Sequence, residues 1–231
     1  MVDKSTFAKL EKCSSGIDGL DQITEGGLPK GRPTLICGAA GSGKTMFAMQ
    51  FLVEGALNNE PGVFISFEEN EEDLIKNFTS LGVDISKLEE QKKLIIEYVF
   101  LERAEIEETG DFDLEGLFIR IKYAMEQIGA KRIVIDTIEA IFAGLPNEFI
   151  LRSELRRLFN WLKNQGLTAV ITGERGEKSL TRYGLEEYVA DCVILLDTIY
   201  TNKVATRNIK IIKYRGSSHG YNEYPFLIND H

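Results

Sequence analysis

The stretch Gly-Ala-Ala-Gly-Ser-Gly-Lys-Thr occupies residues 38–45. It follows an apolar run, Pro33–Cys37, that predicts a strand, and it leads into a predicted helix over Thr45–Glu54. In this order of strand, glycine-rich turn and helix, backbone N–H groups and the positive end of the helix dipole converge on phosphate oxygens. The stretch therefore predicts a phosphate-binding P-loop in an α/β fold rather than a chance turn with an exposed lysine.

The residues of the loop have separate expected roles. Lys44 is expected to reach the β and γ phosphates of a nucleoside triphosphate, and the Thr45 hydroxyl is expected to bind Mg²⁺. ATP and Mg²⁺ are the cofactors that this chemistry requires. The residues expected to bind the nucleotide here are Gly41, Ser42, Gly43, Lys44, Thr45 and Met46.

Apolar runs that predict strands alternate with helical stretches along most of the chain. The runs are Pro33–Cys37, Val63–Phe67, Leu94–Val99, Arg132–Asp136, Thr168–Thr172 and Val193–Leu196. This alternation predicts a mainly parallel sheet with helices on both faces. Polar and apolar residues then alternate over Ala205–Arg215, after a turn-like Thr-Asn-Lys at residues 201–203, which predicts an antiparallel hairpin at the sheet edge.

Carboxylates follow two of these runs. Asp136 ends an apolar strand in the manner of a Walker B element, and we expect it near the metal, although a strand-end aspartate is also a common helix N-cap. Glu68 and Glu69 follow another strand and are expected to polarise the water that attacks the γ-phosphate. Since neighbouring strand residues point to opposite faces, one of the pair is expected to face that water directly. The alternative is a solvated acidic start of a helix.

Lys213 and Arg215 are spaced so that they share one face of a strand. From the pattern alone, an ordinary polar face of an edge hairpin is the better interpretation.

The composition limits the class of protein. The 231 residues carry a net charge of −9, 27% charged and 43% hydrophobic residues, which is typical of one ordered domain and disfavours wrapping a nucleic acid. Cys13, Cys37 and Cys192 have no metal-ligand spacing and are expected to be buried thiols. No apolar run is long enough for a signal core or a membrane span, so a cytoplasmic protein is expected.

From Cys13 onward, these motifs together resemble the N-terminal ATPase repeat of the KaiC family of RecA-like clock ATPases. The matching segments are residues 14–31 (SSGIDGLDQITEGGLPKG), the P-loop, 61–69 (PGVFISFEE), 132–142 (RIVIDTIEAIF), 182–191 (RYGLEEYVAD) and 213–231 (KYRGSSHGYNEYPFLINDH). The resemblance implies an N-terminal arm over residues 1–12 and one RecA-like domain over 13–231.

The resemblance also implies a hexameric ring with ATP held between neighbouring copies. It implies that Glu68 and Glu69 are the catalytic pair and that Ser80 lies near the nucleotide in the same subunit. The neighbour would contribute Lys213, Tyr214, Arg215, Ser217 and His219 over the phosphates and ribose, with Lys213 and Arg215 close to the chemistry, and Asn229 and Asp230 near the base. The loop over residues 100–112 corresponds in place to the part of the ring approached by KaiB, but its residues give no specific support for that contact.

Two-repeat members of this family carry their phosphorylation sites in the second repeat, so no autokinase activity is expected of this single repeat. The chain is either an excised half or a natural single-domain relative. The leading hypothesis is a slow, ring-forming ATPase that gates or times partner binding in a clock-like or stress-related system. The alternatives are a RecA- or RadA-like nucleic-acid-dependent ATPase and a scaffold that assembles on ATP with little turnover.

Overall fold

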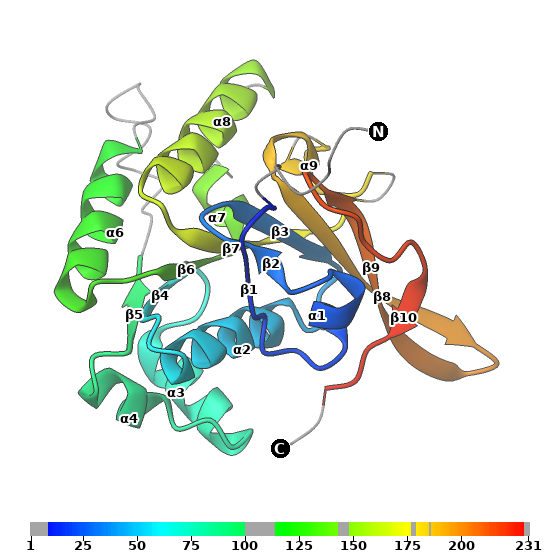
Figure 1. Ribbon diagram of the computed structural model, residues 1–231, viewed down its shortest axis with the longest axis horizontal. Coiled ribbons are helices and arrows are strands. Elements are labelled where there is room, and N and C mark those ends of the chain that lie inside the picture. The colour runs from blue at the N-terminus through cyan, green and yellow to red at the C-terminus, as the bar shows by residue number, and fades with distance from the viewer. Residues whose placement is uncertain (1–8, 100–113, 143–147, 177–178, 185, 229–231) are drawn as a thin grey trace.

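The computed structural model describes residues 9–99, 114–142, 148–176, 179–184 and 186–228 (Figure 1). Within these ranges, eight strands form one sheet in the order β10-β9-β8-β3-β7-β6-β4-β5. The six strands from β8 to β5 are mutually parallel, and β9 and β10 are antiparallel additions. The predicted α/β fold with its antiparallel C-terminal hairpin is thus confirmed.

The strand bounds differ from the expected ones mainly near the C-terminus. β8 is longer than the predicted run, because its pairing with β9 continues into an exposed hairpin arm. β9 is as long as the predicted run but begins one residue earlier, and β10 was not predicted. The bounds are β3 Pro33–Gly38, β4 Gly62–Ser66, β5 Leu94–Tyr98, β6 Arg132–Asp136, β7 Thr168–Glu174, β8 Cys192–Thr201, β9 Val204–Tyr214 and β10 Glu223–Pro225.

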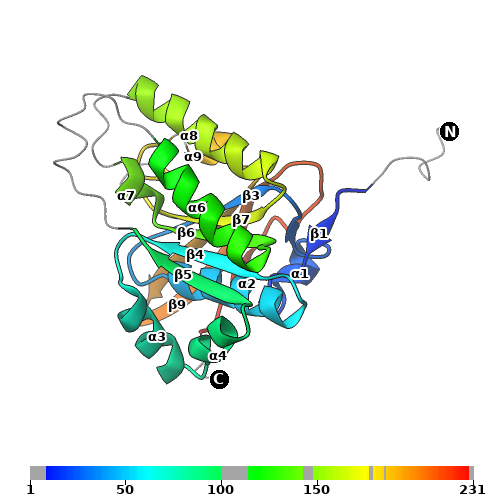
Figure 2. The same cartoon turned by 90° about the vertical axis from the view of Figure 1, so that its left-hand side faces the viewer.

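Helices cover both faces of the sheet, and Figure 2 shows the two layers edge-on. One layer contains α2 (Lys44–Leu57), α3 (Glu71–Ser80) and α4 (Ile85–Glu90). The other contains α6 (Glu115–Ile128), α7 (Ile138–Phe142) and α8 (Glu148–Asn164), and the short α9 (Glu186–Val189) packs near α8. Alternate strand residues face opposite layers, so Leu35 and Ile36 belong to different apolar clusters. Burial on both faces explains the continuous apolar runs.

A β-bulge interrupts the pairing of β8 with β9. Val193 is opposite Lys213, but the next residue, Ile194, is opposite Ile211, so Ile212 is an extra residue in β9. Before it, the buried positions of β9 are Ile209 and Ile211, whereas after it the buried residue is Tyr214. The bulge therefore reverses which residues of the strand face the core.

The chain before the P-loop forms a small amino-terminal hairpin (residues 12–29). Its strands, β1 (Lys12–Cys13) and β2 (Leu28–Pro29), flank the one-turn helix α1 (Leu20–Ile23). Gly27 has a φ of 105°, and a Cβ there would lie 1.9 Å from the Cys13 carbonyl oxygen. Only glycine permits so close an approach of the two strands.

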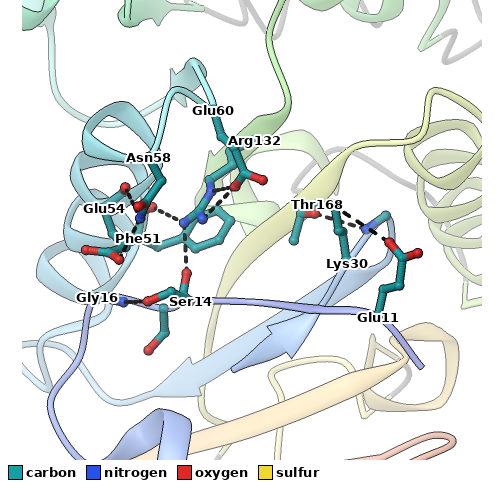
Figure 3. Close-up of polar contacts among 12 residues, drawn as sticks. Glu11, Ser14, Gly16, Lys30, Phe51, Glu54, Asn58, Glu60, Arg132 and Thr168 are labelled. Atoms are coloured by element: carbon teal, nitrogen blue, oxygen red, sulfur yellow. Dashed lines mark hydrogen bonds and ion pairs between the residues drawn. The ribbon is translucent and has the colours of Figure 1, made fainter. Parts of the chain in front are cut away.

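Arg132, at the start of β6, attaches this hairpin to the rest of the domain (Figure 3). Its fully buried guanidinium donates two hydrogen bonds to Glu60 Oε2, at 2.8 and 2.7 Å, and lies over the Phe51 ring. Its Nη1 donates to the backbone carbonyls of Ser14, at 2.9 Å, and Phe51, at 2.8 Å. One charged side chain thus joins the hairpin, α2 and β6, with its donors paired as burial requires.

All three cysteines are free and buried, as predicted, and burial raises the pKa of Cys13 to about 11 and of Cys37 and Cys192 to about 12. Across the described ranges, no helix has the length and apolar character needed to cross a bilayer.

Candidate active site

The sheet order places the carboxyl ends of β3, β7, β6 and β4 side by side. The P-loop follows β3, Thr172 lies near the end of β7, Asp136 ends β6, and Glu68 follows β4. In open parallel sheets, ligands bind outside the carboxyl ends of the strands, at the point where the strand order reverses. Residues far apart in the sequence therefore meet because of the strand order.

The P-loop has the backbone geometry of an anion-binding turn. Gly41 and Gly43 have φ values of 73° and 99°, and the loop tip from Ala39 to Gly41 is exposed to solvent. The buried Ser42 Oγ has no hydrogen-bond partner among the described residues. An unpaired buried hydroxyl and an open turn at a helix N-terminus fit a bound phosphate group.

Lys44 is buried at the first position of α2. Its Nζ donates to the backbone carbonyls of Gly38, at 2.9 Å, and Ala39, at 3.0 Å, both within the loop. The ammonium is therefore held inside the turn, next to where phosphate oxygens would lie.

Asp136 is held between two hydroxyl groups. Thr45 Oγ1 donates to its Oδ2 at 2.9 Å, and Thr172 Oγ1 donates to its Oδ1. Burial raises the pKa of Asp136, while both hydroxyls and Lys44 oppose that rise. One threonine hydroxyl and one carboxylate suit Mg²⁺, which prefers oxygen ligands and shares them with substrate phosphates. We found no group of three or more His, Cys, Asp and Glu side chains that could hold a metal ion in the described ranges.

The two candidate catalytic glutamates point to different neighbours. Thr137 Oγ1 donates to Glu68 Oε1 at 3.2 Å, next to the end of β6. Asn77 of α3 donates to Glu69 Oε2 at 2.9 Å, so the Glu69 side chain is turned toward that helix. Both carboxylates are exposed, but Glu68 is the one that faces the Asp136 edge.

Two further residues expected to contact the nucleotide are Met46, in the first turn of α2, and Ser80, at the end of α3. Met46 is half-buried and packs on the apolar cluster beneath α2. Ser80 is exposed at the end of α3, where its hydroxyl donates to the Asn77 carbonyl at 2.7 Å.

The cations near the end of β9 project together, as their spacing predicts. Lys213 Nζ donates to the carbonyls of Glu187, at 2.8 Å, and Tyr188, at 3.3 Å, and Arg215 Nη2 donates to the same Tyr188 carbonyl at 3.0 Å. Arg215 also lies 3.6 Å from Asp191, but its side chain remains 51% exposed. The pKa of Lys213 is lowered, first by burial and then by Arg215.

The other residues of this basic segment (residues 213–219) have mixed surroundings. Tyr214 is buried, its hydroxyl donates to the Gly27 carbonyl at 2.8 Å, and burial raises its pKa. Ser217 Oγ accepts from Lys12 Nζ at 2.7 Å, and the His219 ring lies 4.8 Å from the Tyr221 ring. Asn229 and Asp230 lie outside the described residues, as does the loop over 100–112.

With this geometry established, the comparisons with known proteins decide the family. The family described as "ATPase: KaiC" matches residues 13–231. The chain belongs to the KaiC family. The KaiC domain seen here is 58% identical, over its whole length, to 41% of the circadian clock protein KaiC2 of Synechocystis. It is 42% identical to KaiC3 of the same organism and 41% identical to the circadian clock oscillator protein KaiC of Synechococcus elongatus, with 99% of the chain aligned in each case.

The KaiC domain spans less than half the length of these relatives, with 46% of KaiC3 and 45% of the Synechococcus KaiC covered. The aligned part corresponds to an ATPase domain of this family.

Sequence reasoning missed several residues of the site. Thr172 gave no signal beyond strand propensity, because its contact with Asp136 arises only from the insertion of β7 between β3 and β6.

The C-terminal stretch of the same chain packs over the start of α2, since a Cβ at Gly43 would lie 2.6 Å from Ile228 Cδ1.

Glu139 was also missed. It is 5% exposed, its Oε1 accepts from the Glu174 amide at 2.7 Å, and its Oε2 has no hydrogen-bond partner in the described part of the chain. Burial, with smaller contributions from the charges of Glu186 and Glu174, raises its pKa to about 7. The sequence signal that could have pointed to Glu139 is a carboxylate among the apolar residues of α7, one turn after Asp136.

Proposed function

We propose that this KaiC domain binds ATP with Mg²⁺ and hydrolyses it slowly in a hexameric ring, at sites shared between neighbouring copies. The observation that carries the proposal is the meeting of Lys44, Thr45, Asp136 and Glu68 at one edge of the sheet. Family membership supports the same activity.

Each residue has a separate part in the proposed reaction. Lys44 and the P-loop amides bind phosphate oxygens, while Thr45 and Asp136 hold Mg²⁺, which neutralises phosphate charge when it is bound. Glu68 orients a water molecule and accepts its proton at the carboxylate. Glu69, held by Asn77, acts through the position of the loop that carries both residues.

Arg215 and Lys213 are assigned to the neighbour's nucleotide. Both cations donate to backbone carbonyls, and the one carboxylate paired with them within the described residues is Asp191, 3.6 Å from Arg215. A partly exposed arginine of this kind is suited to bind a phosphate from another subunit. In this arrangement Ser217 and His219 contact the same nucleotide, while Tyr214 supports the segment from the core.

We further propose that hydrolysis times the binding of a partner, which in a clock-like system would be a KaiB-like protein. The support is that two relatives bear the names circadian clock protein and circadian clock oscillator protein.

Mixed rings test the shared site. Arg215→Ala and the double variant Glu68→Gln, Glu69→Gln should each hydrolyse ATP poorly, one for lack of the neighbour's cation and the other for lack of its own carboxylates. Random equal mixing pairs an intact acidic site with an intact arginine at about one interface in four of a head-to-tail ring. Phosphate release should therefore recover in mixtures to a level that neither variant reaches alone.

Subunit exchange is confirmed by mass measurement. No recovery despite exchange would place Arg215 in its own chain's site or outside the chemistry. A wild-type ring that assembles on ATP without measurable phosphate release would instead identify a scaffold.

A further inference from the structure

The amino-terminal hairpin contacts two parts of the proposed shared site. Figure 1 shows α1 beside α2, which begins at the P-loop, and the Gly220 amide, beyond the end of β9, donates to the Ile23 carbonyl of α1 at 2.8 Å. The hairpin also supports the basic segment, whose residues 215–219 follow β9 directly.

Its contact with α2 is close and polar. Arg132 Nη1 donates to both Ser14 O, in the hairpin, and Phe51 O, in α2 (Figure 3). Gly16 has a φ of 73°, and a Cβ there would lie 2.6 Å from Glu54 Cβ of α2. The hairpin backbone is therefore fixed against the helix that carries Lys44.

Lys12 makes the contact with the basic segment. Its Nζ donates to the Thr24 carbonyl at 2.5 Å, to the Glu25 carbonyl at 3.1 Å and to Ser217 Oγ at 2.7 Å. These bonds use all three ammonium protons. The ammonium also lies 4.9 Å from the centre of the Tyr214 ring, a cation–π distance. Burial lowers the pKa of Lys12.

Other bonds hold the same two segments together. Tyr214 OH donates to Gly27 O at 2.8 Å, Ser218 Oγ donates to Glu25 Oε1 at 2.8 Å, and Gly220 N donates to Ile23 O at 2.8 Å. Arg215 lies between Tyr214 and Ser217, the two residues that Lys12 contacts. The Arg215 backbone amide donates to the carbonyl of Asp191, the residue before β8, at 2.9 Å.

We infer that Lys12 is a positioning residue, which fixes the backbone from Tyr214 to Ser217 so that Arg215 is presented to the nucleotide of the neighbouring copy. The inference rests on the proposed shared site. It assigns a role to a lysine that need not contact any nucleotide itself. The competing explanation is that Lys12 only stabilises the small hairpin.

The first test replaces the ammonium and keeps the apolar stem. Lys12→Met should lower ATP turnover of the assembled ring by about tenfold, since charge-assisted hydrogen bonds are lost. Nucleotide affinity of the dilute, unassembled chain should be unchanged, because its own P-loop is intact. Lys30→Met is the matched control, since Lys30 directly follows the hairpin and its ammonium forms an exposed 3.9 Å pair with Glu11. Equal turnover in the two variants would overturn the inference.

Thermal unfolding establishes that the variants fold. If Lys12→Met is unfolded, Lys12→Gln replaces it, because the amide retains a donor toward the carbonyls and lacks the charge. Lys12→Arg should recover part of the turnover in either case. A fall in dilute-chain affinity equal to the fall in turnover would overturn the inference in favour of a general structural role.

Mixed rings then decide which half of the site Lys12 serves. Lys12→Met mixed with the double glutamine variant should recover turnover, since about one interface in four has both halves intact. Lys12→Met mixed with Arg215→Ala should not recover, because both variants damage the same half.

Recovery with Arg215→Ala but not with the double glutamine variant would assign Lys12 to its own chain's P-loop. That result would overturn the inference and leave the proposed shared site intact. If Arg215→Ala also fails to recover with the double glutamine variant, the shared site itself is wrong, and the inference fails with it.

Discussion

Two lysines of this domain have similar surroundings but belong to regions of different kinds. Lys44 and Lys213 each donate to two backbone carbonyls of their own chain. Lys44 is buried near Thr45 and Asp136, the hydroxyl and the carboxylate that are proposed to bind Mg²⁺. Lys213 is partly exposed beside another cation, Arg215. The P-loop edge thus already brings cation, hydroxyl and carboxylates together, whereas the cations of the basic segment contact backbone carbonyls and, at 3.6 Å from Arg215, the Asp191 carboxylate.

The difference teaches that one half of the proposed site is organised by the sheet and the other by contacts with loops. Four strand ends fix the P-loop edge. The basic segment is fixed by backbone carbonyls of α9 and by the amino-terminal hairpin. Variants in the two halves should therefore fail in different ways.

The largest expected effect comes from exchanging the two lysines for alanine, one at a time. Lys44→Ala should weaken ATP binding by the dilute chain about 100-fold or more, since a buried charge contact to phosphate is lost. Lys213→Ala should leave that affinity unchanged and lower turnover only in the ring. Titration with a fluorescent ATP analogue measures the affinity. Equal loss in both variants would remove the distinction between the two halves.

The next effect separates the two glutamates within the P-loop half. Glu68→Gln should lower the rate of hydrolysis about 100-fold, as expected for loss of a general base, with ATP affinity retained. Glu69→Gln, whose carboxylate contacts Asn77, should lower the rate less than about tenfold. Single-turnover phosphate release compares them. A larger effect at Glu69 would mean that the side chains exchange places when nucleotide binds.

A smaller effect is expected from the hydroxyl that holds Asp136. Thr172→Val keeps the shape and removes the bond to Asp136 Oδ1, and it should weaken Mn²⁺ binding to the ATP complex about tenfold. Electron paramagnetic resonance of Mn²⁺ measures the free ion. Thr34→Val is the control, because Thr34 is equally buried on β3 but lies near its amino end. Identical Mn²⁺ affinity in the two variants would show that Thr172 has no part in the metal site.

The smallest effect on hydrolysis is expected at Glu139, where stability should change with pH. Its pKa is raised from 4.5 to about 7, so the folded state holds the proton more strongly than the unfolded chain. The contribution of Glu139 to the free energy of unfolding is therefore fully present below the unfolded-state pKa of 4.5. It is lost as the pH rises through the folded-state pKa of about 7, by about 3 kcal/mol.

Glu139→Gln should flatten this part of the pH profile, and urea unfolding at about pH 5 and about pH 8 checks it. The titratable groups facing Glu139 are Glu174, Glu186 and Tyr183, so any dependence that persists in the variant belongs to them.

The sheet could be predicted from the sequence because its central strands are buried on both faces and appear as unbroken apolar runs. The P-loop could be predicted because phosphate binding requires glycine, lysine and threonine at fixed spacing. Asp136 was found by its position at a strand end, and Thr45 by its place in the motif. The meeting of these two side chains, at 2.9 Å, agrees with both interpretations.

What the sequence could not reveal depends on neighbours that are distant in the chain. The contact of Thr172 with Asp136 requires the strand order, and that of Lys12 with Ser217 joins residues 205 positions apart. The choice between Glu68 and Glu69 stayed open because both follow the same strand, and only the positions of Thr137 and Asn77 separate them. The expected roles of the basic segment toward a neighbouring copy remain predictions.

The extra residue in β9 decides on which side of the sheet the positive charge appears. Were the strand regular, the alternation that buries Ile209 and Ile211 would continue inward through Lys213, and Tyr214 would point outward. Ile212 shifts the phase by one, which turns the tyrosine in and the cations out. Removal of this single isoleucine would thus exchange the two faces of everything that follows it, without altering one functional residue. The orientation of Lys213 and Arg215 therefore depends on the length of β9 as directly as on the identity of these two residues.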